Sequence, residues 1–339
     1  MLTLTDIGEF GLIDLIKKKF TPYGPETVVG IDDDCAVVTG REGFYTLYTC
    51  DSQVEGSHFI TDLVPPYLLG QKILAVNLSD IAAMGGTPRF ALLSLVLRSE
   101  ISIEWIDTFL EGFRYKANQY DVDVIGGNLA HTDGGLVFDV TCIGEVKRNR
   151  LLLRNQAQAG DMILVTGSLG DAAAGLKILL EEQKMNTARE QYLLNRYFLP
   201  EPRVGVGKIL AESKNRIALI DISDGFAQDL GHLLKQSRVG AIIDPERIPL
   251  SQQLVSWCSE KNYTPLDFAS SGGEDYELIF TTAPENINEL RKKIQDDVGV
   301  PVTIIGEITT GDKLIFQKNE VNYEIHTQGW NHFSSSKEK

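Results

Sequence analysis

The sequence has few cysteines, a shortage of basic residues and no long hydrophobic run. Its four cysteines lie far apart, without a CxxC pair or a histidine at zinc-ligand spacing: Cys35, Cys50, Cys142 and Cys258. We therefore expect reduced, mostly packed thiols. The 32 lysines and arginines are outnumbered by 47 aspartates and glutamates, which gives a net charge of −15. This deficit argues against nucleic acid or an anionic membrane as a partner, because both require clustered positive charge.

Signals for export and membrane insertion are also missing. The N-terminus has no basic segment followed by an apolar core and a cleavage site, and the most apolar stretch, residues 90–97, is too short to span a bilayer. These features predict a cytoplasmic protein. A length of 339 residues suits two domains. Both halves mix strand and helix patterns, so we expect an α/β (α+β) protein with two mixed domains, at residues 1–148 and 149–339.

The sequence does contain aspartates at the ends of predicted elements. Asp32, Asp33 and Asp34 follow one another in a turn between two apolar runs. Carboxylates this crowded repel one another unless a cation lies among them or water solvates them, so an exposed acidic turn and a metal site both fit this stretch. Further acidic residues recur where a strand or helix pattern ends: Asp51, Asp80, Asp221, Asp224, Glu274 and Asp275. Because Mg²⁺ prefers carboxylate oxygens and substrate phosphates, we interpret the set as a metal–phosphate cluster.

The position of Asp80 supports this interpretation. It lies in the last two turns of a helix predicted over residues 68–84, where the helix dipole disfavours a carboxylate by about 0.3–1 kcal/mol. A bound cation or a hydrogen bond from a neighbouring side chain would offset that cost. Asp221 and Asp224 precede another predicted helix, residues 226–236. Ser223 would be a good N-cap there, but capping alone does not account for both aspartates.

Two glycine-containing segments could approach a phosphate. A strand predicted over residues 122–125 ends in a turn at Gly126-Gly127-Asn128, and a strand over 162–166 leads through a glycine loop into a helix over 171–180. The chain has neither a Walker loop nor a full GxGxxG. Neither of the common nucleotide-binding folds is therefore indicated.

Taken in order, these motifs resemble the thiamine-monophosphate kinases, a family related to aminoimidazole ribonucleotide synthetase and selenophosphate synthetase. The resemblance runs from about Gly8 to Phe333. It is carried by Gly8 to Phe10, Gly30 to Cys35, Asp51 with Gly56 and His58-Phe59, Asn77 to Gly85, Gly126-Gly127, Arg154, Gly167 to Gly175, Asp221 to Gly225, Asp229 to His232, Ser271 to Leu278 and Gly329 to Phe333. The segment 271–277 and the aromatic residue near the C-terminus separate this family from its relatives.

The resemblance implies ATP-dependent phosphorylation of thiamine monophosphate to thiamine diphosphate, with several Mg²⁺ ions in a cleft between the domains. It also implies a homodimer, which we expect to pair through the N-terminal sheet. The implied magnesium ligands are Asp33, Asp51, Asp80, Asn128, Asp221 and Asp224, with Thr49 and Cys50 contributing backbone atoms. The implied ATP contacts are Gly127, Asn128, Arg154 and Ser223, and the implied contacts to thiamine monophosphate are His58, Glu274 and Trp330.

The implied chemistry asks for charge neutralisation and alignment. Asp51, Asp80 and Asp224 would position charge, and we assign no acid or base because the acceptor phosphate is already ionised. Trp330 could stack on the cationic thiazolium, which is worth about 0.5–2 kcal/mol, or could pack the last segment onto the domain. His58 could contact the substrate or have a structural role.

Three positions depart from the family pattern. Asn128 stands where the family has aspartate, which removes a charge from one metal site; Asp32 stands in place of glycine, and Cys50 in place of threonine. Two alternatives therefore remain: another ATP-using enzyme of this superfamily, or a nucleotide-binding homologue with weakened turnover. A calcium-binding protein is a third, but the nearest EF-hand pattern has Ile125 where an oxygen ligand is required and Thr132 where a bidentate glutamate is required.

Overall fold

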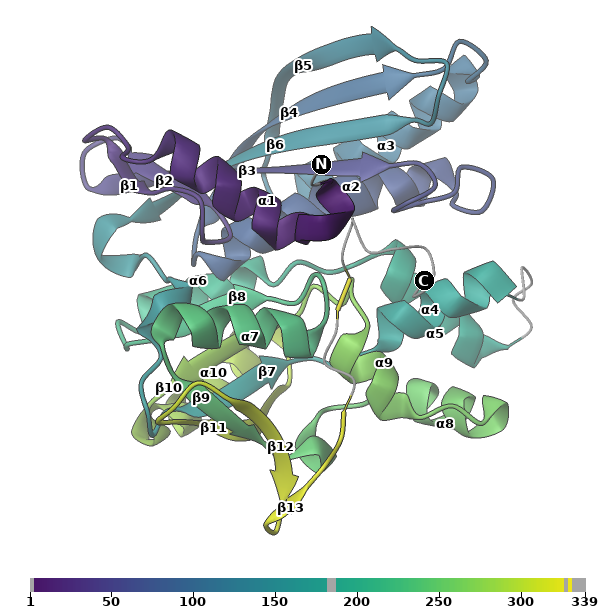
Figure 1. The fold of residues 1–339 in the computed structure, drawn as a ribbon. Coiled ribbons are helices and arrows are strands. Elements are labelled where there is room, and N and C mark those ends of the chain that lie inside the picture. The colour runs from purple at the N-terminus through teal and green to yellow at the C-terminus, as the bar shows by residue number, and fades with distance from the viewer. Residues whose placement is uncertain (1–2, 182–186, 326–328, 331–339) are drawn as a thin grey trace.

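Two β-sheets, one in each half of the chain, organise the fold in the computed structural model, which describes residues 3–181, 187–325 and 329–330 (Figure 1). The first sheet has the strand order β1-β2-β3-β6-β4-β5, and only β4 and β5 pair in parallel. Its strands are β1 (Thr27–Val29), β2 (Ala36–Thr39), β3 (Phe44–Val54), β4 (Thr87–Leu97), β5 (Asp123–His131) and β6 (Val137–Lys147). The helices of this half are α1 (Leu4–Phe20), α2 (Pro66–Ala83) and α3 (Ile103–Gln119).

The second sheet has the order β13-β12-β9-β11-β7-β10-β8, with β12 and β9 as its parallel pair. Its strands are β7 (Met162–Thr166), β8 (Ala218–Asp221), β9 (Gly240–Ile243), β10 (Leu278–Thr282), β11 (Val302–Thr309), β12 (Leu314–Lys318) and β13 (Val321–Asn322). The helices are α4 (Asp171–Glu181), α5 (Ala188–Phe198), α6 (Val204–Glu212), α7 (Phe226–Ser237), α8 (Gln252–Lys261), α9 (Pro265–Ser271) and α10 (Ile287–Val298). Short 3-10 helices at Arg148–Arg150 and Arg154–Gln156 connect the two halves. The predicted mixed α/β class is confirmed.

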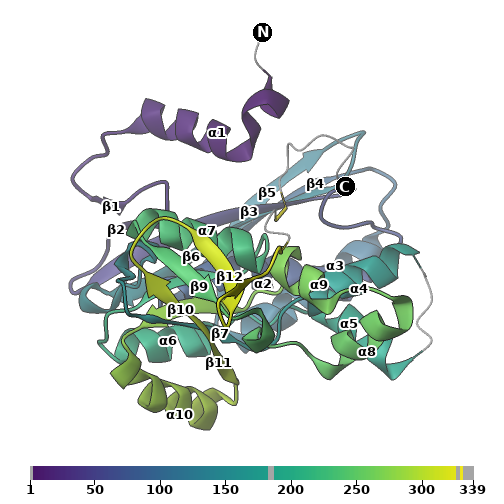
Figure 2. The same cartoon turned by 60° about the horizontal axis from the view of Figure 1, so that its bottom comes forward.

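Helix α2 lies between the two halves and is buried along most of its length (Figures 1 and 2). It packs on α3, β3 and β6 of the first half and on α6 and β8 of the second. Gly85 ends it with φ of +68°, and a Cβ there would lie 2.7 Å from that of Ala211 on α6, so glycine permits this close approach. Polar side chains of α2 are buried as well, among them Lys72, Asn77 and Ser79. Such groups require partners, and several of these partners lie at the candidate site.

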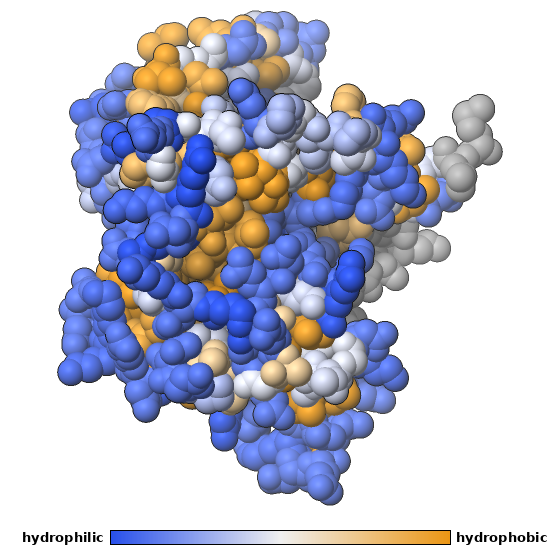
Figure 3. Space-filling model, turned by 90° about the vertical axis from the view of Figure 1, so that its left-hand side faces the viewer, coloured by the Kyte–Doolittle hydropathy of each residue, from blue (hydrophilic) through white to orange (hydrophobic). Residues whose placement is uncertain are grey.

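One face of the first sheet is much more exposed than the other. Alternate residues of β6, such as Phe138 and Val140, are fully buried on the side of α2 and α3. All nine residues of the edge strand β5 are exposed, including Ile125 at 57% and Leu129 at 75%. Hydrophobic residues also gather at the top of the molecule, over this sheet, and in the hollowed centre of the face in Figure 3. No residue of α1 is buried, and Figure 2 shows this helix crossing outside the body.

The structure corrects the prediction of a turn at Gly126-Gly127-Asn128. These residues lie inside β5, paired with Leu92, Leu93 and Ser94 of β4. The glycine at 127 permits this pairing because a Cβ there would lie 1.7 Å from the Leu93 carbonyl oxygen. A register shift at Ala91 and Leu92 marks the same irregularity. The glycines that predicted the end of a strand therefore lie within the strand, because they allow the close approach of β4.

The structure also bears on the expectations about the cysteines and about membrane insertion. All four cysteines are free, with Cys35, Cys142 and Cys258 buried and Cys50 exposed. In the described part of the chain, no helix is long and apolar enough to cross a bilayer. The boundary between residues 148 and 149 stays a prediction.

Candidate active site

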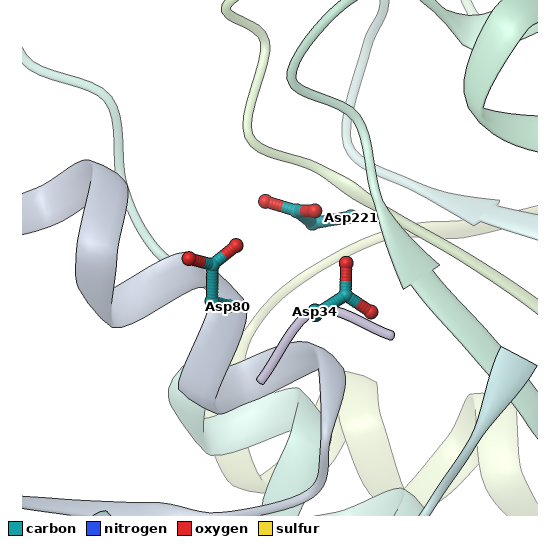
Figure 4. Close-up of side chains that lie close together, drawn as sticks. All are labelled: Asp34, Asp80 and Asp221. Atoms are coloured by element: carbon teal, nitrogen blue, oxygen red, sulfur yellow. The ribbon is translucent and has the colours of Figure 1, made fainter. Parts of the chain in front are cut away.

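Three carboxylates from distant parts of the chain meet between the two halves. Carboxylate oxygens of Asp34, Asp80 and Asp221 all lie within 4.8 Å of one another (Figure 4). Asp34 comes from the loop between β1 and β2, Asp80 from the last turn of α2, and Asp221 from the end of β8. We call these three residues the carboxylate cluster. The sequence pattern found Asp80 and Asp221, but it selected the neighbour Asp33 in place of Asp34.

The cluster carries more negative charge than the surrounding residues balance. Burial and the nearby Asp51, Asp221 and Asp34 raise the pKa of Asp80 well above its usual value. Burial and Asp34 raise the pKa of Asp221 to about 8. Side-chain hydroxyls partly offset this: Ser79 donates to Asp221 at 2.6 Å, and Thr49 donates to Asp80. Such a site favours either a proton or a bound cation.

Arg154 is the guanidinium beside this cluster. Its Nε donates to Asp34 Oδ2 at 3.2 Å, and its Nη2 donates to the other oxygen of the same carboxylate. The backbone amide of Arg154 donates to Asp33 Oδ2 at 3.3 Å. Burial, followed by the charge of Asp34, raises the pKa of Asp33 to about 7. The predicted metal ligand Asp33 and the predicted ATP contact Arg154 thus lie together beside the cluster.

The donor set of the cluster fits Mg²⁺. Its atoms are carboxylate and hydroxyl oxygens, the ligands that Mg²⁺ prefers. No cysteine belongs to the cluster among the described residues; Cys35 is buried, and burial and the acidic groups raise the pKa of its thiol well above the usual value. The clustered donors are all oxygens, so the site favours a hard cation over zinc.

A cleft of about 970 Å³ opens beside the cluster. Seven residues selected from the sequence line it: Asp51, His58, Asp80, Ser223, Asp224, Glu274 and Trp330. The N-terminal half supplies Asp51 and His58, and the C-terminal half supplies Ser223 and Glu274. Leu176, Leu179 and Leu180 of α4 add an apolar wall. The cleft therefore joins an acidic end to a surface on which an organic ring could pack.

The turn that carries Ser223 and Asp224 is held by a residue to which the sequence assigned no role. One oxygen of the buried Asp229 carboxylate accepts the backbone amides of Ser223, Asp224 and Gly225, at 3.0, 3.1 and 3.1 Å. Gly225, with φ of +133°, is the N-cap of α7, so the N-cap expected at Ser223 is wrong. The turn is consequently fixed before any ligand binds.

The segment with Glu274 is fixed in an unusual backbone conformation. Glu274 has φ of +69° and Tyr276 has φ of +49°, a region that costs non-glycine residues about 1–3 kcal/mol each. The amide of Glu274 donates to the Ser223 carbonyl at 2.7 Å, and that of Tyr276 donates to the Ile222 carbonyl at 2.8 Å. Strained residues of this kind concentrate at ligand sites. Here the conformation presents both side chains to the cleft.

Hydrogen bonds fix the ring of His58 and the main chain of Trp330. His58 Nδ1 accepts the amide of Val54 at 3.0 Å, so the neutral imidazole carries its proton on Nε2. The Trp330 amide donates to the Asp224 carbonyl at 3.0 Å, and Gln228 donates to the Trp330 carbonyl at 3.0 Å. This ties the predicted substrate contact at Trp330 to the turn that carries Asp224. Residues 331–333 of the C-terminal motif lie outside the described residues.

Three of the predicted site residues do not point toward the carboxylate cluster: Gly127, Asn128 and Cys50. Gly127 and Asn128 are on the edge strand β5, which β4 and β6 separate from β3. The register aligns Asn128 with Ser94, Asp139 and Ser52, whereas Asp51 aligns with Val140, whose side is covered by α2. Cys50 is exposed and accepts a weak hydrogen bond from Thr141 at 3.6 Å, while its neighbour Thr49 points to Asp80. Within one chain, the side chains of Asn128 and Cys50 therefore face away from the cluster, and the backbone contribution expected of Cys50 stays a prediction.

Other residues of the site had no assignment from the sequence. Asp34 adjoins the predicted Asp33, and spacing alone cannot choose between adjacent aspartates in a loop. Asp229 and Tyr276 lie inside motifs that were recognised without a role for either residue. Lys72 precedes the recognised motif Asn77 to Gly85 on α2, and Tyr197 is on α5 outside any recognised motif. Their roles, described below, become visible only through packing.

Comparisons with known proteins show which families this chain is similar to. Residues 32–146 match the family described as AIR synthase related protein, N-terminal domain, and residues 158–319 match the corresponding C-terminal domain. Thiamine-monophosphate kinase from Haemophilus influenzae is 36% identical over 98% of this chain and 99% of its own length, and that from Escherichia coli K12 is 37% identical over 97% and 99%. A solved structure described as AaThiL complexed with AMPPCP and TMP covers 98% of this chain and 99% of its own, with 33% identity and a TM-score of 0.87. The thiamine-monophosphate kinase structure from Stenotrophomonas maltophilia covers 92% and 98%, with 36% identity and a TM-score of 0.76.

Proposed function

The chain belongs to the thiamine-monophosphate kinase family and is built from the two domains of AIR synthase related proteins, and on this premise we propose that it phosphorylates thiamine monophosphate. ATP would donate its γ-phosphoryl group, and thiamine diphosphate and ADP would be the products. One observation carries the proposal: three predicted acidic residues line a single cleft together with the predicted substrate contacts, Asp51, Asp80 and Asp224 with His58, Glu274 and Trp330. The related structure with AMPPCP, an analogue of ATP, and TMP is consistent with both substrates.

The cleft suits transfer between two phosphates because its acidic end can collect cations. Asp34, Asp80 and Asp221 would hold Mg²⁺, with Asp33, Asp51 and Asp224 as further candidates at the same end. Bound Mg²⁺ supplies charge neutralisation and alignment for the phosphoryl groups. The acceptor phosphate needs no strong base, since phosphoryl transfer depends mainly on positioning and electrostatics. Arg154 and Ser223 would contact ATP beside this end.

The other end of the cleft suits thiamine. The Nε2–H of His58 is a donor for the acceptor phosphate, and the Trp330 indole can lie against the cationic thiazolium. The Glu274 carboxylate can accept from the aminopyrimidine, with the leucines of α4 as the apolar wall. These roles account for an acidic cleft with one apolar side.

A homodimer through the first sheet is part of the proposal. The edge strand β5 and its apolar neighbours on β4, Phe90 and Leu92, are exposed, and a second copy would cover them. Gly127 and Asn128 lie on this edge, so in a dimer they could serve nucleotide binding across the interface. Sedimentation of the purified chain tests the assembly: a monomer at micromolar concentration would contradict it. The predicted cytoplasmic location would give the enzyme ATP and free Mg²⁺.

Product analysis tests the reaction directly. Purified protein is incubated with ATP, Mg²⁺ and thiamine monophosphate, and the thiamine compounds are separated by chromatography. We expect thiamine diphosphate and an equal amount of ADP, with no product when the metal is chelated. Thiamine without phosphate serves as the control acceptor. Nucleotide binding without any thiamine diphosphate would contradict the proposal and favour a homologue with weakened turnover or another acceptor.

A further inference from the structure

A buried lysine lies directly behind the cleft. Lys72, on α2, is 1% exposed, and its Nζ lies 2.9 Å from Oε1 of Glu274. The same ammonium sits 3.5 Å from the centre of the Tyr197 ring on α5. Burial lowers the pKa of Lys72, whereas the charge of Glu274 acts in the opposite direction. Burying a cation costs free energy of desolvation, which one carboxylate and one aromatic face offset only in part. The presence of Lys72 at this position therefore calls for a functional explanation.

Tyr197 makes a second connection to the cleft. Its ring is almost fully buried beneath Lys72, and its hydroxyl donates to the main-chain carbonyl of His58 at 3.1 Å. The loop that carries His58 is thereby attached to α5. The Val54 amide donates to the imidazole ring of His58, and Tyr197 donates to its carbonyl. Both the ring and the main chain of His58 therefore have fixed positions.

The two connections cross the boundary between the halves in opposite directions. Lys72 in the N-terminal half reaches Glu274 in the C-terminal half, and Tyr197 in the C-terminal half reaches His58 in the N-terminal half. Each ends on a residue that lines the cleft, and the ring of Tyr197 contacts Lys72, so the pair acts as one unit. Glu274 has an unfavourable φ, which makes an anchor for its side chain more important.

We propose that Lys72 and Tyr197 are positioning residues for thiamine monophosphate, which hold Glu274 and His58 at a fixed separation across the domain boundary. The inference rests on the proposed function and deepens it. Lys72 binds one oxygen of Glu274, so the carboxylate meets the ligand as an oriented hydrogen-bond acceptor whose charge is balanced. A misplacement of either contact would reduce binding of the acceptor and leave ATP binding unchanged.

The chain offers a matched control. Lys116 on α3 is 3% exposed, its Nζ lies 3.3 Å from Oε2 of Glu201, and it is 5.7 Å from the centre of the Tyr120 ring. It too links the N-terminal half to the C-terminal half, but neither Lys116 nor its partners line the cleft. Loss of a buried ion pair is thus common to Lys72→Met and Lys116→Met, and only the first would disturb substrate contacts.

The test is a set of KM and kcat measurements for both substrates on the full chain. For Lys72→Met we expect KM for thiamine monophosphate to rise about tenfold, equivalent to about 1.4 kcal/mol, with KM for ATP within about twofold of wild type. For Tyr197→Phe, which keeps the ring and removes one hydrogen bond, we expect a rise of about threefold. Lys116→Met should keep both KM values while its thermal stability falls.

A double variant shows whether Lys72 acts through Glu274. The KM of Lys72→Met/Glu274→Gln should equal that of Glu274→Gln, because Lys72 then has no carboxylate to orient. Effects that multiply, an unchanged KM in Lys72→Met, or equal rises for ATP and thiamine monophosphate would each overturn the inference. If Lys72→Met does not fold, Tyr197→Phe decides: a wild-type KM would overturn it. A wild-type enzyme that makes no thiamine diphosphate would instead refute the proposed function, and this inference with it.

Discussion

Two groups of buried carboxylates in this protein are balanced in different ways. Glu277, at the start of β10, is fully buried and receives charged hydrogen bonds from Arg196 at 2.9 Å and Arg203 at 2.6 Å, and a neutral one from Thr166 at 2.6 Å. Burial alone would raise the pKa of Glu277, but the two guanidiniums outweigh it and lower the pKa. In the carboxylate cluster, by contrast, burial and like charges raise the pKa of Asp80 and Asp221.

The difference in pKa separates a carboxylate that stabilises the fold, Glu277, from carboxylates that are available to bind a cation. Around Glu277 the chain supplies two guanidiniums, of which Arg196 also lies 3.7 Å from the buried Asp171 carboxylate. Around the cluster it supplies Arg154, which is already shared by Asp33 and Asp34. Glu277 and Asp221 are both almost fully buried, so burial does not distinguish the two regions. The missing counter-charge does distinguish them, and bound Mg²⁺ would provide it.

Removing the balanced carboxylate should have the largest effect, and on stability. In Glu277→Gln the buried Arg203 loses its carboxylate partner and Arg196 keeps only Asp171 at 3.7 Å, so we expect the free energy of unfolding to fall by about 3–5 kcal/mol. Urea denaturation measures this value. The Mg²⁺ concentration for half-maximal activity should stay unchanged in the folded fraction. A stability loss below about 1 kcal/mol would refute the view that this network is structural.

Removing a carboxylate of the cluster should lower activity and raise the stability of the metal-free protein. Asp80→Asn keeps the shape and removes one charge, so we expect kcat/KM to fall by about 10²–10³-fold, in line with the several kcal/mol that a bound metal supplies. The metal-free protein should become more stable because repulsion is relieved. Calorimetry without metal and kinetics with Mg²⁺ check the two effects. Asp107→Asn, on the exposed side of α3, is the control. Equal losses of activity and stability would remove the contrast with Glu277.

Metal binding should stabilise the protein through the cluster alone. At a Mg²⁺ concentration 100 times the dissociation constant, a ligand that binds only the folded state adds about 2.7 kcal/mol. We expect the melting temperature to rise with Mg²⁺ in wild type and in Glu277→Gln, and to stay constant in Asp80→Asn. Sodium chloride at equal ionic strength separates binding from screening. A rise of the same size in Asp80→Asn would place the metal elsewhere.

Much of this arrangement was predictable from local patterns, because element ends and acidic residues are local features. The strand at Met162–Thr166 has the predicted bounds, and the helix at Pro66–Ala83 differs from its prediction by a few residues. The predicted turn at Gly126-Gly127-Asn128 is wrong because it depended on the approach of β4, which local sequence does not encode. The choice of Asp34 over Asp33 in the cluster depends likewise on Arg154, 120 residues away.

The smallest effect concerns Asp32, the additional aspartate at the border of the cluster. The chain balances this residue at the surface: Lys17 of α1 pairs with its carboxylate, and Gln236 of α7 donates to its carbonyl. Its φ of +153° favours glycine, so Asp32→Gly loses a surface ion pair of about 0–1 kcal/mol but relieves the backbone. Asp32→Asn loses the pair and keeps the strain. We therefore expect the glycine variant to be the more stable of the two by about 1 kcal/mol, with the Mg²⁺ dependence of activity unchanged in both. Equal stabilities would show that the backbone at Asp32 is relaxed, and a shifted Mg²⁺ dependence would show that Asp32 belongs with the unbalanced carboxylates.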